Sequence, residues 1–163
     1  MNRTSAAVRF PPAQHDHDDC VETALGRAED LCRARGLRLT GLRRRVLELV
    51  WDSHKPAGAY EILDSLNREG RRAAPPSVYR ALDFLIDADL VHRLDSLNAF
   101  VGCRDPGNAH TGQFLICRQC RSVAELDDSG IADLVGRRAA ELGFTAVRQV
   151  VEIEGLCQDC SRT

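Results

Sequence analysis

Four of the seven cysteines in this 163-residue chain form two C-x-x-C pairs, Cys117/Cys120 and Cys157/Cys160. A C-x-x-C turn holds two thiolates close enough to bind one metal ion, and two such turns complete a closed tetrahedral zinc site. Thioredoxin-like redox enzymes also use this motif, but they place it at the start of a helix in a βαβ unit, a pattern that this sequence lacks. The cysteines therefore predict a structural zinc site that links the end of the chain to its middle.

Hydropathy and charge narrow the class of protein. No apolar run approaches the roughly 18 residues that span a bilayer, and the N-terminal segment has no apolar signal region, so a cytoplasmic protein is expected. In that reducing compartment, paired cysteines are expected to be metal ligands rather than disulfides. Residues 27–80 hold 12 Arg and Lys against 7 Asp and Glu, whereas residues 81–163 hold 8 against 13. The basic first half suits a polyanionic partner.

Helical periodicity runs through the first half of the chain. We expect a helix over residues 21–35 that stops at Gly36, a second helix capped by Thr40, and a third that ends at Gly70. A fourth helix is predicted in PPSVYRALDFLIDADL, capped by Ser77, with an apolar stripe made of Val78, Ala81, Leu82, Leu85 and Ile86. The short strands LVHRL and AFVG follow, joined by a turn. This order predicts a winged helix-turn-helix domain over residues 20–101.

The second half predicts a small α+β domain over residues 113–163. Strands are expected in QFLIC, SVAEL and FTAVRQVVEIEG, and an amphipathic helix is expected over residues 129–142, whose inward residues would be Ile131, Leu134, Val135 and Leu142. The glycine-rich segment GCRDPGNAHTG, residues 102–112, is the predicted hinge. Residues 1–19 are interpreted as a disordered tail. The tail's HDHDDC could bind a metal through His15, His17 and Cys20, although a solvated acidic segment is the simpler interpretation.

Four further potential ligands cluster around the predicted hinge. His92 lies on the first strand of the wing, Cys103 and His110 lie in the hinge, and Glu125 follows the first C-x-x-C pair. Two imidazoles, a thiolate and a carboxylate suit a tetrahedral zinc site, and the thiolate favours zinc over manganese or ferrous iron. A structural histidine and a buried, inert Cys103 are the alternative interpretation.

A nucleic-acid surface is also predicted on the winged helix. Tyr79 and Arg80 lie off the apolar stripe in the first turn of the fourth helix, where side chains can reach base edges. Arg43, Arg44 and Arg45 are candidates for phosphate contacts, and a plain solvated face is nearly as good an interpretation of each.

Several segments together resemble the ferric uptake regulator superfamily, with closest agreement to its zinc uptake regulator branch. They are RLTGLRRRVL, PPSVYRALDFLIDADLVHRL, the NAH of the hinge, FLICRQC and GLCQDC, and the resemblance extends from about residue 22 to residue 160. It implies a DNA-binding winged helix, a dimerising C-terminal domain, and a hinge metal that sets the angle between them. By position, the paired cysteines match structural zinc ligands, the mixed set of four matches regulatory ligands, and Tyr79 and Arg80 match recognition residues.

The resemblance implies a zinc-responsive repressor, with no enzymatic activity, that binds palindromic operators as a homodimer with two Zn²⁺ per subunit and shuts off zinc uptake genes. Two departures matter. The chain has only His110 in HTGQFLIC, ahead of the first C-x-x-C, which argues against iron, and it has Gly41 and Leu42 where the family commonly has proline and glutamine. The alternatives are an iron, manganese or nickel sensor of the same superfamily, a zinc hydrolase and a zinc buffer.

Overall fold

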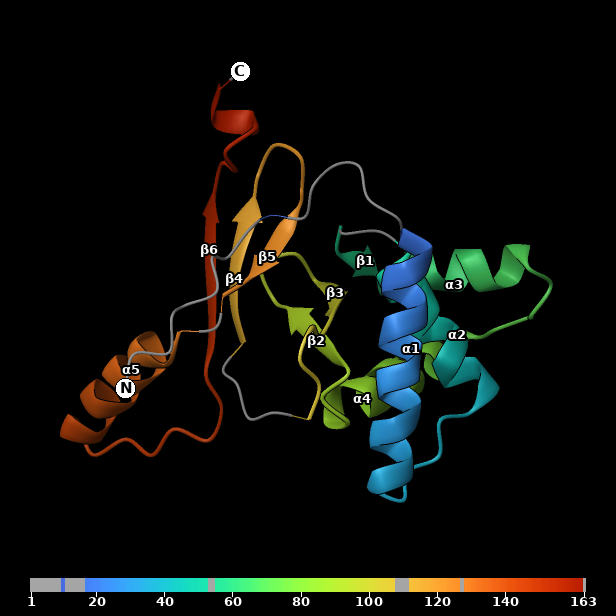
Figure 1. Ribbon diagram of the computed structural model, residues 1–163, viewed down its shortest axis with the longest axis horizontal. Helices are drawn as coiled ribbons and strands as arrows, with labels where there is room; N and C mark the ends of the chain where they lie inside the picture. The colour runs from blue at the N-terminus through green and yellow to red at the C-terminus, as the bar shows by residue number, and fades with distance from the viewer. Residues whose placement is uncertain (1–9, 11–16, 53–54, 108–111, 127, 163) are drawn as a thin grey trace. The chain divides into compact units, whose positions relative to one another are not determined.

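The structure is a computed structural model that describes residues 10, 17–52, 55–107, 112–126 and 128–162. Its contacts divide the chain into two compact units, one over Pro12–Asn108 and the other including Ala109–Thr163 (Figure 1). Within the described residues, no helix combines the length and the apolar character needed to cross a membrane.

The N-terminal unit is a winged helix-turn-helix. Its elements are α1 (His17–Ala34), α2 (Gly41–Trp51), β1 (Ala57–Gly58), α3 (Ala59–Arg68), α4 (Pro75–Asp87), β2 (Val91–Leu94) and β3 (Ala99–Gly102). The three strands form an antiparallel sheet in the order β1-β3-β2, in which β2 and β3 make the hairpin of the wing. The α+β fold class and this order of elements confirm the prediction from the sequence.

The helix ends follow local capping rules, with two differences from the prediction. The hydroxyl of Thr40 accepts a hydrogen bond from the Arg43 N–H at 3.4 Å, as expected for the N-cap of α2. However, α1 begins at His17, four residues before the predicted start. Ser77 lies inside α4 rather than capping it, because α4 already begins at Pro75. A proline at the first helical position loses no hydrogen bond, since that N–H has no partner in the helix.

The core of this unit is the apolar stripe of α4 packed against α2 and α3. Val78, Ala81, Leu82 and Leu85 are all at most 3% exposed, which confirms the predicted stripe, whereas Ile86 is only partly buried. Leu42, one of the departures from the family pattern, packs against this core, and Cys32 is buried within it. Tyr79 and Arg80 lie outside this buried stripe, on the exposed face of α4.

The C-terminal unit is a three-stranded sheet with one helix. It contains β4 (Gly112–Cys117), β5 (Val123–Glu125), α5 (Ser129–Glu141), β6 (Val150–Gly155) and the 3₁₀ turn η1 (Cys160–Arg162). The strand order is β5-β4-β6, with β5 antiparallel and β6 parallel to β4. The last predicted strand is shorter than FTAVRQVVEIEG, because regular pairing starts only at Val150. The sequence did not predict that β6 would run parallel to β4.

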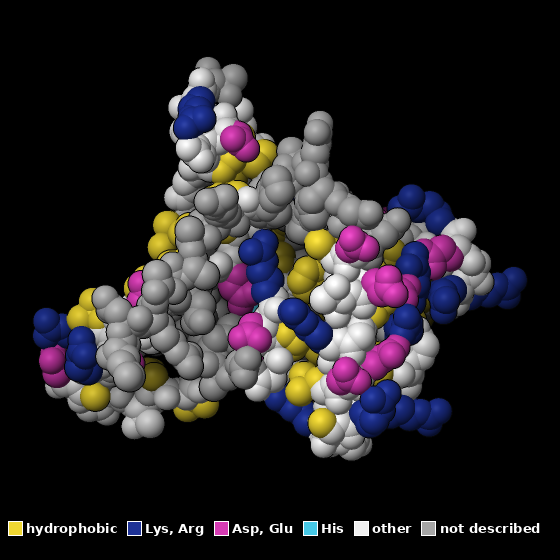
Figure 2. All heavy atoms as spheres, viewed as in Figure 1, with side chains coloured by type: hydrophobic (Ala, Val, Ile, Leu, Met, Phe, Trp, Pro, Cys, Tyr) yellow, Lys and Arg dark blue, Asp and Glu magenta, His cyan; other side chains and the backbone are white. Residues whose placement is uncertain are grey.

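The prediction that the apolar residues of α5 face inward is wrong for the single chain. Leu134 is 50% exposed, Val135 is 44% exposed and Leu142, which follows the helix, is 86% exposed, while Ile131 is partly buried. Figure 2 shows hydrophobic side chains reaching the surface over α5. The helix is amphipathic, as the periodicity indicates, but no side chain of α5 is fully buried against the described residues of this chain. Periodicity identifies an apolar face without identifying what covers it.

Candidate metal centres and nucleic-acid interface

The first pair of cysteines sits on a tight turn at the end of β4. The Cys117 N–H donates to the carbonyl of Ser122 and the Arg121 N–H donates to the carbonyl of Cys117, both at 2.9 Å. Arg121 has φ 62, in the left-handed region, which reverses the chain direction within the turn. These two bonds return the backbone so that the thiols of Cys117 and Cys120 face the same point.

The parallel pairing of β4 and β6 brings the second pair to that point. Cys117 lies opposite Gly155 in the register, and the Arg118 N–H donates to the Gly155 carbonyl at 2.9 Å. The four thiol sulfurs of Cys117, Cys120, Cys157 and Cys160 all lie within 4.8 Å of one another, and those of Cys120 and Cys157 are 3.8 Å apart. Zn–S bonds of about 2.3 Å imply S···S distances of about 3.8 Å in a tetrahedron. The geometry therefore fits one tetrahedral zinc ion.

Hydrogen bonds make the four thiols unequal. Backbone N–H groups, first that of Cys120 and then that of Cys157, lower the pKa of Cys117 to about 6, and the latter bond measures 3.4 Å. The Ser122 hydroxyl lowers the pKa of Cys120, whose sulfur lies 3.2 Å from it. Cys160 instead donates toward Cys157, which raises the Cys160 pKa to about 12. The site thus stabilises thiolates, the form that binds a metal, at its β4 turn.

A second group of potential ligands lies on the wing. His92 is on β2, where it pairs with Val101, and Cys103 directly follows β3, where its N–H donates to the Leu90 carbonyl at 3.0 Å. A ring nitrogen of His92 and the Cys103 sulfur lie within 4.8 Å of each other, and Cys103 is 4% exposed. The antiparallel hairpin therefore places an imidazole and a thiol side by side. An imidazole and a thiolate are zinc's preferred ligand types.

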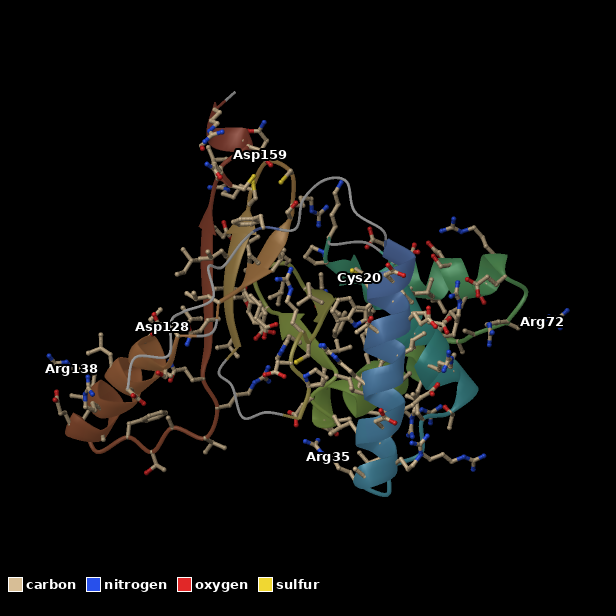
Figure 3. The ribbon with its side chains drawn as sticks, viewed as in Figure 1. Cys20, Arg35, Arg72, Asp128, Arg138 and Asp159 are labelled. Carbon is tan, nitrogen blue, oxygen red and sulfur yellow. The ribbon has the colours of Figure 1, made fainter. Side chains whose placement is uncertain are left out.

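The remaining ligand candidates belong to other segments of the chain. Glu125 is the last residue of β5 in the C-terminal unit and is partly buried. His110 and the tail's His15 are outside the described residues. His17 is the first residue of α1, and Cys20 lies on the same helix, partly buried and labelled in Figure 3. The assignments of His110 and Glu125 therefore stay predictions.

The candidate nucleic-acid surface centres on the N-terminal half of α4. Tyr79 is 41% exposed, and Arg80 is exposed and makes no hydrogen bond or ion pair with the described residues. Both side chains lie off the buried stripe, as the periodicity indicates. In a helix-turn-helix the N-terminal residues of the second helix contact base edges in the major groove. These two side chains are placed where such contacts are made.

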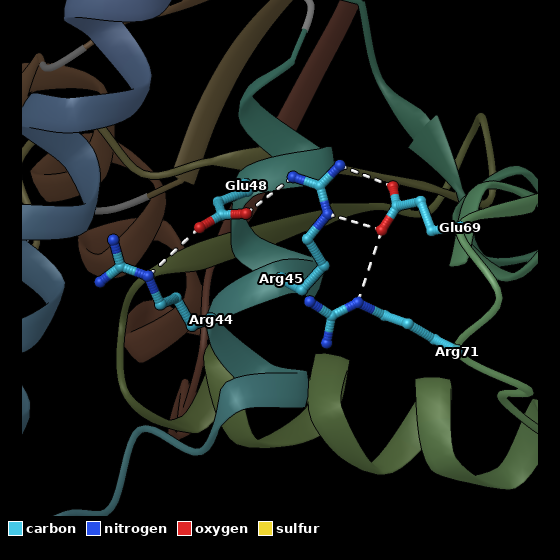
Figure 4. A network of polar contacts seen from close by, with 5 residues as sticks. All are labelled: Arg44, Arg45, Glu48, Glu69 and Arg71. Atoms are coloured by element: carbon cyan, nitrogen blue, oxygen red, sulfur yellow. Dashed lines mark hydrogen bonds and ion pairs between the residues drawn. The ribbon is translucent and has the colours of Figure 1, made fainter. Parts of the chain in front are cut away.

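The three arginines at the start of α2 have intramolecular partners. The Arg43 guanidinium lies 3.6 Å from the centroid of the Phe84 ring and donates to the Arg38 carbonyl. Arg44 pairs with Glu29 of α1 and with Glu48, the latter at 3.2 Å. Arg45 contacts Glu48 at 2.7 Å and Glu69 at 2.6 Å (Figure 4). Their phosphate contacts stay a prediction, and any such contact has to compete with these partners.

Sequence reasoning missed the carboxylates that pair with these arginines. Glu48 lies three residues after Arg45 and four after Arg44, a helical spacing that was readable in the sequence. Glu69 comes from the end of α3, and only the packed structure places it beside α2. Hydrogen bonds from Arg45 lower the pKa of Glu69, and the bonds to Glu69 and Glu48 raise the pKa of Arg45.

Comparison with known proteins identifies relatives of this chain. The ferric uptake regulator family model matches residues 34–154. The zinc uptake regulation protein of Escherichia coli K12 is 39% identical over 143 residues, which cover 86% of this chain and 82% of that protein. The zinc uptake regulation protein of Mycobacterium tuberculosis H37Rv is 30% identical over 133 residues, covering 78% of this chain and 97% of that protein.

Solved structures show the same similarity. A zinc uptake regulator complexed with zinc and DNA superposes with a TM-score of 0.83 at 37% identity, covering 87% of this chain and 95% of that one. The holo form of XcZur superposes with a TM-score of 0.81 at 44% identity, covering 86% of this chain and 99% of that one.

Proposed function

The chain belongs to the ferric uptake regulator family, and on this premise we propose that it is a zinc-responsive transcriptional repressor. When zinc is plentiful, it binds operator DNA and represses genes for zinc uptake. The proposal is carried by the imidazole of His92 and the thiol of Cys103, which lie within 4.8 Å of each other on the wing of a DNA-binding fold. The similarity to zinc uptake regulators at 39% identity supports zinc as the metal sensed.

Two zinc ions per subunit are proposed, with different roles. Cys117, Cys120, Cys157 and Cys160 form a closed set of four thiolates that leaves no open position for water or substrate, so this site is structural. His92, Cys103, His110 and Glu125 form the regulatory site. Because four protein ligands complete a tetrahedron there as well, a hydrolytic role, which needs an open coordination position, is not favoured.

The regulatory ligands come from different parts of the chain, and this distribution explains the switch. His92 and Cys103 belong to the winged helix, whereas Glu125 belongs to the C-terminal unit. Joint binding of one ion by these residues selects one arrangement of the two units from those that the hinge allows. Zinc supplies the binding energy for that selection, and the chain supplies the ligands and the recognition helix.

DNA recognition is assigned to α4. Arg80 is suited to a bidentate contact with the O6 and N7 atoms of guanine, and Tyr79 to a thymine methyl group or a phosphate. Arg43, Arg44 and Arg45 would add phosphate contacts, but we expect smaller contributions from Arg44 and Arg45, because carboxylates already pair with them. A repressor acts where the chromosome is, so we place the protein in the cytoplasm.

A homodimer on a palindromic operator completes the proposal. The exposed apolar residues Leu134, Val135 and Leu142 in and after α5 are unusual for a surface and suit burial against a second copy of the chain. A two-fold dimer presents two recognition helices to successive turns of the major groove, which matches the two-fold symmetry of a palindrome.

The decisive experiment measures DNA binding as a function of free zinc. A pool of duplexes with randomised cores is selected with the zinc-loaded protein, and binding of the enriched duplex is then titrated in zinc buffers, with iron(II), manganese and nickel buffers in parallel. We expect palindromic sequences to be enriched and bound tightly only with zinc. DNA binding that depends on iron(II), manganese or nickel instead of zinc would show that the protein senses that metal. Zinc binding without DNA binding would indicate a zinc buffer.

A further inference from the structure

The segment between α3 and α4 holds a strained arginine. Arg72 has φ 41, in the left-handed region that residues other than glycine rarely adopt, and Gly70, two positions earlier, has φ 77. Such backbone strain persists only where the surrounding structure imposes it, and it is concentrated at functional sites. A long cation at a position that suits glycine therefore raises the question of what the side chain does.

Several backbone contacts hold this segment in place. The side-chain oxygen of Asn67 accepts a hydrogen bond from the Ala73 N–H at 2.8 Å, and the Arg71 N–H donates to the Leu66 carbonyl at 3.1 Å. The Ala73 side chain packs against the core of the winged helix. The segment is therefore anchored on both sides of Arg72, and Figure 3 shows the Arg72 side chain pointing away from the body of its unit.

The charge of Arg72 is left available, unlike that of its neighbours. Arg71 lies 3.5 Å from Glu69, and Arg45 forms ion pairs with both Glu48 and Glu69 (Figure 4). Arg72, in contrast, is exposed and makes no hydrogen bond or ion pair with any residue that the structure describes. A cation on an anchored backbone that has no partner among the described residues is suited to an external anion.

The position of Arg72 identifies that anion. Arg72 precedes the first residue of α4 by three positions. Because the N-terminal residues of a recognition helix contact base edges, residues just before it lie over the phosphates that flank the major groove. Resting on the proposed function, we propose that Arg72 binds a DNA phosphate and thereby positions α4 for base contacts by Tyr79 and Arg80.

The test compares Arg72→Gly with Arg33→Ala in the zinc-loaded protein. Glycine accepts the left-handed backbone, so Arg72→Gly removes the charge and relieves the strain, and its melting temperature should not fall. One phosphate contact contributes about 0.9 to the slope of log affinity against log salt. Because the proposed dimer loses two such contacts, we expect the affinity deficit of Arg72→Gly to be about 12-fold larger at 50 mM than at 200 mM salt, on both the selected duplex and an unrelated one.

Two controls isolate the role of this charge. Arg72→Lys should recover most of the salt slope, and Arg33→Ala, which removes an arginine of α1 that pairs with Asp30 at 3.0 Å, should leave the slope close to that of the wild type. If the wild type binds the selected duplex and Arg72→Gly shows the same affinity and slope, Arg72 does not bind phosphate and this inference alone is wrong. If the wild type shows no zinc-dependent DNA binding, the proposed function fails and this inference fails with it.

Discussion

At the scale of single residues, the thiols of the four-cysteine cluster differ in how the chain prepares them for a metal. Backbone N–H groups of Cys120 and Cys157 lower the pKa of Cys117 to about 6, so its thiolate predominates at neutral pH. The Cys117 backbone also makes two of the hydrogen bonds that form the β4 turn. Cys117 therefore combines a ready thiolate with a role in the turn that places Cys120.

Replacing Cys117 by serine should remove the structural zinc. A serine hydroxyl is not deprotonated at neutral pH, and the small three-stranded sheet has little core with which to compensate for the lost ion. We expect Cys117→Ser to lose one zinc per subunit and to lose dimerisation with it, as measured by metal analysis and sedimentation. Cys20→Ser, which changes a cysteine outside this cluster, is the matched control. A folded Cys117→Ser dimer with undiminished zinc would show that these cysteines are not the ligands.

At the scale of elements, the end of α2 and the wing are packed too closely for a side chain at Gly102. A Cβ atom there would overlap the ring of Trp51, the only tryptophan in the chain. Gly102 ends β3 and immediately precedes Cys103, so the position of this proposed ligand depends on the contact between β3 and α2. The glycine is required here for space, not for backbone freedom.

Gly102→Ala should weaken the regulatory site and spare the structural one. Relief of the overlap must move either Trp51 or β3, at a cost of about 1–3 kcal/mol in unfolding free energy. We expect a shifted Trp51 emission spectrum and a lower zinc affinity at the regulatory site, with one tightly bound zinc retained. Gly26→Ala, in α1 with no atom within 4 Å of the new methyl group, should raise stability by about 0.5–1 kcal/mol and leave zinc binding unchanged. Equal zinc affinity in both variants would show that zinc binding by Cys103 does not depend on the packing of Trp51 against Gly102.

At the scale of the whole molecule, the proposed regulation depends on ligands contributed by two separate units. The winged helix supplies His92 and Cys103, and the C-terminal unit supplies Glu125. In this proposal, an ion bound by both units would shift the population toward the arrangement that binds DNA, and the apparent DNA affinity would follow the fraction of molecules in that arrangement. The structural cluster lies within the C-terminal unit alone, so it should stabilise that unit without acting as the sensor.

Cys103→Ser separates these two roles. The loss of one soft ligand should sharply lower zinc affinity at the regulatory site, so the DNA-binding arrangement becomes a minor state. The variant should remain a folded dimer with one zinc per subunit, and its DNA binding should no longer respond to low free zinc in a buffered titration. If Cys103→Ser binds the selected duplex like the wild type at every zinc concentration, Cys103 is a buried apolar residue and the regulatory site is elsewhere.

The sequence by itself determined the features that depend on local spacing. The apolar stripe of α4, the cap at Thr40 and the exposure of Tyr79 and Arg80 follow from helical periodicity and capping chemistry, which act over a few residues. The two C-x-x-C turns indicated a four-thiolate site for the same reason, since each turn is built within four residues. The stripe, the cap and the exposure of Tyr79 and Arg80 were predicted correctly because no distant contact opposes them.

Only the tertiary structure decided the features that join distant segments. The parallel pairing of β4 with β6 brings Cys157 to Cys117, Glu69 of α3 takes Arg45 as its partner, and Trp51 closes over Gly102. The exposed apolar face of α5 and the left-handed backbone of Arg72 were also not predictable from local spacing. Each depends on which surfaces pack together, and spacing along the chain does not encode that choice, because the free energy of packing is shared among residues far apart in the sequence.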